Sequence, residues 1–206
     1  MDNKILLVLD IDETLLHSSE RKLDRKEDYF YYEFDKFGEV EFFVYKRPHW
    51  DALKKVIEEN DNIEYGFYSN SMKNYCNELA DWLSEDMNKR PLFTFDRSRV
   101  TNKVESSSSL YDSFSSSRSL VIKDLKKVAR NTDIPVKNMI CLDDKPVYPR
   151  QYGNLVKISE YRGDTNDTEL KSFSKRLEKL AKTFDGVDIR NNLKKVSKKT
   201  SFDLNF

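Results

Sequence analysis

The sequence has few cysteines, no excess charge of either sign and no long apolar run. Its two cysteines, Cys76 and Cys141, lie far apart among 206 residues. This excludes a disulfide framework and a thiolate zinc site and makes a reducing compartment the expectation. The 36 basic and 36 acidic side chains cancel, so the chain lacks the global basic field of proteins that coat nucleic acids or membrane surfaces.

No segment reaches the roughly 18 apolar residues of a membrane span, and the N-terminal residues lack the layout of a cleavable signal peptide. We therefore expect a soluble intracellular protein, nuclear or cytoplasmic, without a membrane partner. An apolar fraction of 38%, with 13 Phe and 11 Tyr, suffices for a core and argues against a disordered chain. The length predicts one domain over residues 1–188 and a short basic helix or tail over residues 189–206.

Apolar segments alternate with helical patterns along the chain. Strands are predicted over residues 4–9, 63–68, 139–142 and 155–158, and helices after Pro48, after Ser71, over 121–130 and over 170–184. We expect Ser71 to cap its helix and Met72, Tyr75 and Trp82 to lie on the core face of that helix. Strands that alternate with helices predict an α/β fold with a right-handed, mostly parallel sheet.

Residues 29–46 interrupt this alternation. Aromatic and polar side chains alternate here around Phe37-Gly38-Glu39, which predicts a β-hairpin apart from the main sheet. Its aromatics either line a groove for an extended, proline-containing peptide or in part form the packing face of the hairpin itself: Phe30, Tyr32, Phe34, Phe42 and Phe43. Residues 105–119 are so rich in serine that a loop is expected there.

The segment Asp10-Ile11-Asp12-Glu13-Thr14 stands where the first predicted strand ends. Ligands of open parallel sheets collect beyond the carboxyl ends of the strands. Alternation along an extended segment points Asp10 and Asp12 the same way, and two crowded carboxylates require either a cation between them or a proton on one of them. The alternative is an ordinary acidic turn after a strand.

A second pair of acids, Asp143 and Asp144, directly follows the strand predicted over residues 139–142. Two buried strands of one parallel sheet thus each deliver carboxylates at their carboxyl ends. This is the ligand set of a hard cation, and Mg²⁺ is the natural candidate because it takes one or two carboxylates, waters and phosphate oxygens. Ser69 follows the middle strand and Lys123 follows the serine-rich loop. They are candidate site residues only because they occur together with these acids. Alone they are an ordinary helix-entry residue and a solvated charge.

At this point the residues resemble a known family. DIDETLLHS, FYSNS, VIKDL and LDDKP resemble, in this order, the four motifs of the haloacid-dehalogenase superfamily of phosphotransferases. VLDIDETLLHSS and YKRPHW are similar to segments of the small phosphatases that act on the RNA polymerase II C-terminal-domain repeat. The resemblance covers about residues 4–180. It departs at Asn70, where a small residue is usual, at Asp144, where close relatives carry asparagine, and in the extra serine-rich loop.

The resemblance implies a Rossmann-like central parallel sheet flanked by helices, with the hairpin inserted after the first motif and no large cap domain. It also implies two-step phosphoryl transfer through an aspartyl-phosphate. Asp10 would be the nucleophile and Asp12 the general acid and base. Lys123 would also be catalytic, offsetting charge on the phosphoryl group and on Asp143 behind it. The remaining roles would be Mg²⁺ binding by the Asp10 carboxylate, the Asp12 carbonyl and Asp144, and phosphate binding by Thr14, Ser69, Asn70 and Lys123.

We therefore expect a magnesium-dependent phosphatase of phosphoserine or phosphothreonine in a protein or peptide, with substrates like the polymerase C-terminal domain. Little room remains between the motifs for a roofing domain, and an open site suits a phosphate carried on a protein chain. The alternatives are a catalytically weak binding module of the same fold and a phosphatase of nucleic-acid ends or small metabolites. The terminal lysines are ordinary for a solvated tail, so nucleic acid is not the expected partner. The sequence does not indicate an oligomeric state.

Overall fold

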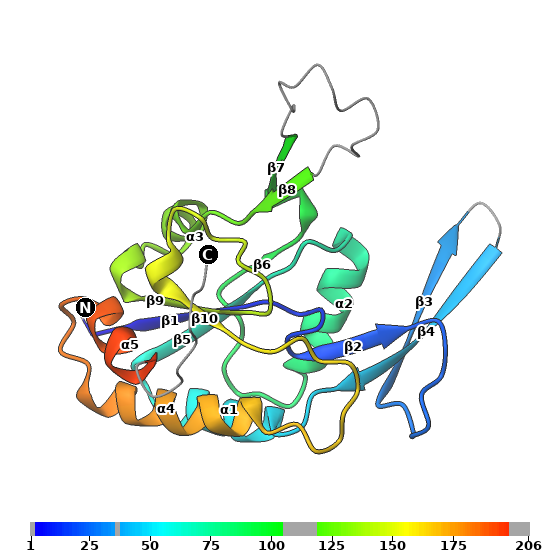
Figure 1. Cartoon of the computed structure of the whole chain (residues 1–206), viewed down its shortest axis with the longest axis horizontal. Helices are drawn as coiled ribbons and strands as arrows, with labels where there is room; N and C mark the ends of the chain where they lie inside the picture. Colours follow the sequence, from blue (N-terminus) through cyan, green and yellow to red (C-terminus); the bar gives the residue numbers. More distant parts are fainter. Residues whose placement is uncertain (1–2, 36–37, 105–118, 198–206) are drawn as a thin grey trace, which may run out of the picture.

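The computed structural model describes residues 3–35, 38–104 and 119–197. At its centre lies a sheet of five parallel strands in the order β10-β9-β1-β5-β6 (Figure 1). These strands are β1 Ile5–Leu9, β5 Ile63–Tyr68, β6 Thr94–Phe95, β9 Met139–Asp143 and β10 Leu155–Lys157. The predicted parallel α/β fold and its four predicted strands are confirmed. Most of the serine-rich loop, residues 105–118, lies outside the described residues.

Helices cover both faces of this sheet. Ile5, Leu7 and Leu9 of β1 pack into a core that they share with helices on one face: α1 Trp50–Glu59, α2 Lys73–Leu83, α4 Glu169–Thr183 and α5 Ile189–Ser197. Leu6 and Val8 point to the other face, toward α3 Leu125–Thr132. Figure 1 shows α1 and α4 side by side on one side of the sheet and α3 on the other. Because β1 is covered on both faces, all of its side chains are apolar, and its sequence is a continuous apolar run. Short 3-10 helices complete this body: Arg97–Arg99, Val136–Asn138 and Tyr152–Asn154.

The hairpin predicted over residues 29–46 is present and belongs to a second, antiparallel sheet. Its strands are β2 Leu16–Ser19, β3 Tyr29–Asp35 and β4 Gly38–Lys46, in the order β2-β4-β3, and the hairpin projects from the body (Figure 1). Tyr29 stacks on Trp82 of α2 with ring centroids 4.9 Å apart. The base of the hairpin is thereby fixed to α2.

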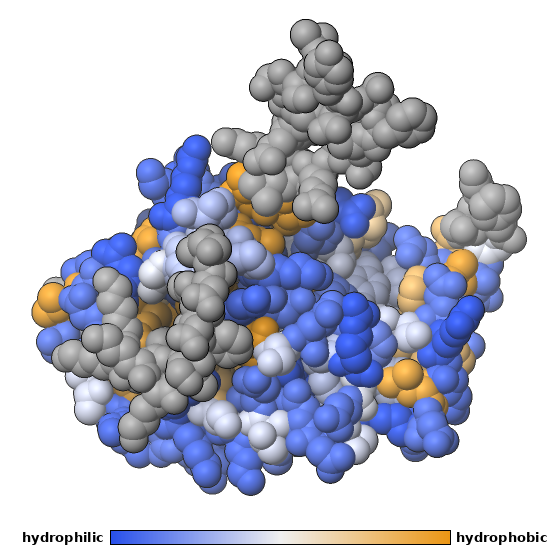
Figure 2. Space-filling view, viewed as in Figure 1, coloured by the Kyte–Doolittle hydropathy of each residue, from blue (hydrophilic) through white to orange (hydrophobic). Residues whose placement is uncertain are grey.

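The hairpin aromatics divide between its two faces, because successive side chains of a strand alternate. Phe42 packs beside Tyr31 against the core. Phe30, Tyr32 and Phe34 remain 36%, 48% and 77% exposed, and Figure 2 shows apolar residues on the hairpin surface. The packing alternative therefore holds for Phe42, whereas these three side chains are free to line a groove.

Three local predictions were wrong. Residues 121–122 are not helical: they end strand β8 Ser119–Ile122, which pairs antiparallel with β7 Thr101–Val104, and α3 begins only at Leu125. The β-branched Val121 and Ile122 suit this pairing better than a helix. The cap of α2 is Met72, without a side-chain hydrogen bond, and Met72 is exposed rather than in the core. Ser71 does not cap α2, because its hydroxyl donates a hydrogen bond to Asp12 instead.

Both cysteines are buried and free. Burial raises the pKa of the Cys76 thiol to about 12 and the pKa of Cys141 well above its ordinary value. This excludes reactive thiolates at physiological pH. Among the described helices, none is long and apolar enough to cross a bilayer.

Candidate active site

Three acids meet at the carboxyl edge of the central sheet. Asp10 directly follows β1, Asp143 ends β9 and Asp144 follows it, and β1 and β9 are parallel neighbours with Leu9 opposite Leu142. One carboxylate oxygen from each acid lies within 4.8 Å of the other two. The parallel register thus brings together side chains that are more than 130 positions apart in sequence.

Lys123 neutralises two of these acids. Its Nζ lies 2.6 Å from Oδ1 of Asp10 and 2.7 Å from Oδ2 of Asp143, and all three side chains are buried. The rings of Tyr68 and Tyr148 also face the ammonium group, with centroids 5.7 and 6.0 Å away. Burial lowers the pKa of Lys123, but the charges and hydrogen bonds of Asp10 and Asp143 outweigh it and raise the pKa above its ordinary value. Lys123 is therefore cationic at neutral pH.

One lysine does not balance the local negative charge. Burial raises the pKa of Asp10 to about 8, the charges of Asp143 and Asp12 act in the same direction, and Lys123 opposes them. Burial also raises the pKa of Asp144. A divalent cation beside these carboxylates would favour their ionised forms, and oxygen donors are the ligands of hard cations. The donor set therefore fits such an ion.

Thr14 connects the two strand ends. Its buried hydroxyl donates to Oδ2 of Asp10 over 2.9 Å and accepts a hydrogen bond from the backbone N–H of Asp144 over 3.1 Å. Oδ1 of Asp144 lies 3.4 Å from the same hydroxyl. The structure thus places Thr14 against protein groups, where it fixes the orientation of Asp10 relative to Asp144.

Asp12 is held by three hydroxyl groups, two from the turn between β5 and α2 and one from α2 itself. Ser69 and Ser71 donate to its Oδ2 over 3.0 and 2.6 Å, and Tyr75 donates to its Oδ1 over 2.6 Å. Burial first, and then the charge of Asp12, raises the pKa of Tyr75, which stays a donor. Sequence analysis selected Ser69 but missed Ser71 and Tyr75. Ser71 precedes α2 and Tyr75 lies among the buried residues of that helix, and no spacing in the sequence distinguishes either of them from an ordinary turn residue or a core aromatic.

Asn70 lies between Ser69 and Ser71 at the same edge. Its backbone carbonyl accepts a hydrogen bond from Nε of Arg97 over 2.8 Å. Its buried Oδ1 has no partner among the described residues. Asn70 can donate to a phosphate from its side-chain Nδ2 or from its backbone N–H but not from Oδ1, so a phosphate-binding role requires one of these two nitrogens to face the site.

Arg47 supports the loop that carries Thr14. This arginine, 1% exposed, donates from Nη1 to the carbonyl of Thr14 over 3.0 Å. It also makes a two-pronged ion pair with Asp167, with Nε–Oδ1 and Nη2–Oδ2 distances of 3.0 and 2.7 Å. Glu13, in the same loop, has a left-handed φ of 60°, a conformation that non-glycine residues adopt only when their surroundings enforce it. The loop geometry therefore depends on contacts distant in sequence.

Replacing Asp167 by Asn is expected to lower the free energy of unfolding by about 3 kcal/mol at pH 7, because Arg47 loses its charge partner while buried. Burial raises the pKa of Asp167, but hydrogen bonds from Arg47 and the Glu169 amide outweigh it and lower the pKa below the ordinary 3.8. The ion pair between Arg47 and Asp167 therefore stabilises the fold fully above about pH 4. This stabilisation is lost as the pH falls through the folded-state pKa of Asp167. Urea unfolding at several pH values measures it. Asp164→Asn is the matched control, and equal stability of Asp167→Asn and wild type at pH 7 would refute the assignment.

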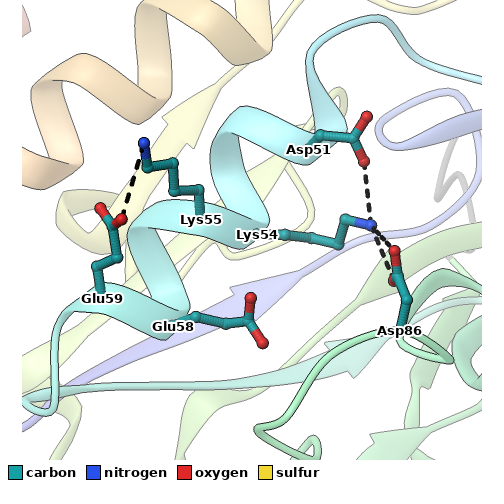
Figure 3. Close-up of a pocket in the computed structure, with 6 residues that line it drawn as sticks. All are labelled: Asp51, Lys54, Lys55, Glu58, Glu59 and Asp86. Atoms are coloured by element: carbon teal, nitrogen blue, oxygen red, sulfur yellow. Dashed lines mark hydrogen bonds and ion pairs between the residues drawn. The ribbon is translucent and has the colours of Figure 1, made fainter.

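A second group of charges lies on α1, away from these acids. Figure 3 shows Lys54 between Asp51 and Asp86, with Nζ–O distances of 3.0 and 2.6 Å. Lys54 is largely buried, and its two partners neutralise it. This group fastens α1 to the segment after α2 and offers no unpaired reactive group for catalysis.

Comparison with known proteins supplies independent information. Residues 5–188 match the family model of NLI interacting factor-like phosphatases. The chain is 27% identical to Nuclear envelope morphology protein 1 of Saccharomyces cerevisiae, over 97% of this chain and 43% of that protein. It is 28% identical to human Carboxy-terminal domain RNA polymerase II polypeptide A small phosphatase 1, over 89% of this chain and 62% of that protein. It is 30% identical to CTD nuclear envelope phosphatase 1 of Xenopus laevis, over 87% and 68%. The chain thus spans less than two thirds of the first two relatives.

The fold is also similar to solved structures. The structure of Fcp1, described as an essential RNA polymerase II CTD phosphatase, superimposes with a TM-score of 0.61 at 14% identity, covering 97% of this chain and 66% of that one. A fission yeast Fcp1 variant bound to beryllium fluoride gives a TM-score of 0.52 at 17% identity, covering 100% and 59%. At these identities the similarity establishes the fold.

Proposed function

Because this chain belongs to the NLI interacting factor-like phosphatase family, as its four motifs suggested, we propose that it is a magnesium-dependent phosphatase of phosphoserine or phosphothreonine in proteins. The observation that carries this proposal is the convergence of Asp10, Asp143 and Asp144, with Lys123 paired to the first two and Asp12 beside them. The site combines a buried carboxylate, a cation-binding set and a second acid in one place, which is what phosphoryl transfer through an aspartyl-phosphate requires.

In the first step, an oxygen of Asp10 attacks phosphorus. The new P–O bond to Asp10 forms as the P–O bond to the substrate serine breaks, and the electron pair of the broken bond goes to the serine oxygen. Asp12 gives that oxygen its proton. Thr14 orients Asp10, and Lys123 offsets the charge of Asp10 and Asp143, so that two anions can approach each other.

In the second step, water attacks the same phosphorus and Asp12 takes up a proton from it. The P–O bond to Asp10 breaks, its electron pair returns to the carboxylate, and inorganic phosphate leaves. Ser69 lies beside Asp12 and, with the Asn70 amide, would hold phosphoryl oxygens. Each group that this cycle uses returns to its starting protonation state.

Asp10 and Asp144, with the carbonyl of Asp12, are the proposed holders of Mg²⁺, and Asp143 stays with Lys123. Bound there, the ion would supply positive charge to the phosphoryl oxygens. This assignment uses the oxygen-only character of the site and the proximity of the three carboxylates. Thr14 orients the Asp10 carboxylate, Lys123 favours its ionised form, and the bound ion would favour the ionised forms of Asp10 and Asp144 further.

Asp144→Ala is expected to raise the Mg²⁺ concentration for half-maximal activity at least about tenfold, because it removes a direct ligand. Lys145→Ala is the matched control: this exposed ammonium group lies 3.6 Å from Oδ2 of Asp144, and its loss removes a competing positive charge. The control is therefore expected to need the same or less Mg²⁺. A metal titration that Asp144→Ala leaves unchanged would contradict the ligand assignment.

The substrate is proposed to be a phosphorylated segment of a protein chain. The exposed Phe30, Tyr32 and Phe34 of the hairpin suit an extended peptide. The names of the human relative and of Fcp1 refer to the C-terminal domain of RNA polymerase II. Because two relatives carry names that refer to the nuclear envelope, nuclear phosphoproteins are the first candidates.

Turnover on phosphorylated polymerase repeats, a phosphorylated oligonucleotide and a sugar phosphate tests this proposal. The phosphopeptide is expected to have the highest kcat/KM, because its chain can contact the hairpin. Higher kcat/KM on the oligonucleotide or the sugar phosphate would replace the proposed substrate class, and no turnover of any of them would favour a binding role.

A further inference from the structure

Tyr75 occupies a position between Asp12 and the hairpin sheet. Its hydroxyl lies 2.6 Å from Oδ1 of Asp12 and 2.6 Å from Oγ of Ser18 on β2. Oδ1 of Asp12 only accepts hydrogen bonds, both in the ionised carboxylate and in the acid protonated on Oδ2, so Tyr75 donates to Asp12 and accepts from Ser18. The side chain is 9% exposed, and this polar contact is therefore shielded from water.

The Tyr75 ring is held from several sides. Tyr31 of β3 meets it edge to face, with centroids 4.8 Å apart and the ring planes at 87°. Ser18 belongs to β2, which pairs with hairpin strand β4 at Val44. The position of the hydroxyl is thus set jointly by α2 and by the sheet that contains the hairpin.

The three hydroxyl groups on Asp12 are not equivalent. In the proposed function Ser69 binds the phosphoryl group, so its hydroxyl must turn away from Oδ2 of Asp12 when substrate binds. Ser71 stays 2.6 Å from Oδ2, and its hydroxyl can accept a hydrogen bond from that oxygen when Oδ2 is protonated. Tyr75 contacts the other oxygen, Oδ1, and can keep that contact throughout. Oδ2 is then the oxygen that carries the proton to the leaving group.

We propose that Tyr75 is a positioning residue for Asp12: its hydrogen bond to Oδ1 fixes the carboxyl group so that Oδ2 faces the leaving oxygen. This inference rests on the proposed phosphatase function and adds a residue that acts through Asp12 without touching the substrate. The proton moves from Asp12 to the leaving serine oxygen, and Tyr75 retains its own proton. Tyr75 also makes acid catalysis dependent on the hairpin sheet, through Ser18 and Tyr31.

The test compares two leaving groups in single-turnover cleavage. Tyr75→Phe is expected to slow cleavage of a phosphoserine peptide by about 10- to 100-fold, part of the 10²- to 10⁴-fold that general acid catalysis supplies. Cleavage of dinitrophenyl phosphate should change by less than about threefold, because its leaving group needs no proton. The ratio of the two rates within one preparation does not depend on the fraction of folded protein.

Tyr29→Phe is the matched control, since it removes a hydroxyl of another hairpin tyrosine, which donates to Glu78, and leaves the contact to Asp12 intact; it should preserve the wild-type ratio. In an Asp12→Asn background, Tyr75→Phe should cause no further loss on the peptide. Equal slowing of both substrates, no slowing of the peptide, or an additive loss in that background would overturn the positioning role. If wild-type protein cleaves neither substrate, the proposed function fails instead.

Discussion

Asp10→Asn is expected to reduce turnover of both a phosphoserine peptide and an aryl phosphate by at least about 10³-fold. Removing a covalent nucleophile eliminates the reaction path rather than one stabilising contact, which is why such losses are large. Asparagine fills nearly the same volume and keeps an oxygen for the hydroxyl of Thr14, which donates to Asp10 over 2.9 Å. Steady-state kinetics with both substrates provide the measurement.

The matched comparison for Asp10→Asn is Asp24→Asn, a conservative change at an exposed acid in the segment before β3. This control should retain wild-type turnover. Circular dichroism and thermal unfolding of Asp10→Asn should show an intact fold, because Lys123 keeps its 2.7 Å contact with Asp143. Activity of folded Asp10→Asn close to that of wild type would exclude Asp10 as the nucleophile.

Lys123→Met is expected to lower kcat by about 10²- to 10⁴-fold and the free energy of unfolding by about 3 to 5 kcal/mol. The loss of stability follows from leaving the buried carboxylates of Asp10 and Asp143 without their shared cation. The pKa of Lys123 is raised above the ordinary 10.5. Its stabilisation is therefore complete at neutral pH and is lost only as the pH rises through that folded-state pKa. Urea unfolding at pH 7 and steady-state kinetics measure the two effects.

Lys126→Met provides the control for Lys123→Met, because Lys126 lies exposed in the first turn of α3. It should change stability by less than about 0.5 kcal/mol and leave kcat unaltered. If Lys123→Met were as stable and as active as Lys126→Met, the lysine would not be the counter-ion of the site.

The acidic centre was predictable because parallel strands end at a common edge. The apolar run before Asp10 and the one before Asp143 identify two central strands, and their carboxyl ends must then meet. No knowledge of the intervening 130 residues is needed for that step. The helix around Trp50 was also predictable from the sequence, since its apolar residues repeat at three- and four-residue spacing.

Other features depend on contacts that a single segment does not encode. Tyr75 looks like a core aromatic on an amphipathic helix until its hydroxyl is placed against Asp12. Arg47 becomes a buried support only in combination with Asp167, 120 positions later. Strand β8 is four residues long and pairs with β7 across the serine-rich segment. So short a stretch shows no distinguishing period.

The most direct test of the central proposal is capture of the phosphorylated protein. The Asp12→Asn variant keeps the nucleophile but cannot take a proton from the attacking water, so the intermediate should accumulate with dinitrophenyl phosphate, whose leaving group needs no acid. Acid quench and peptide mass spectrometry then locate the modification. We expect one phosphoryl group on Asp10 that hydroxylamine removes. A phosphoryl group on another residue, or substrate cleavage while Asp10 stays unmodified, would contradict the mechanism.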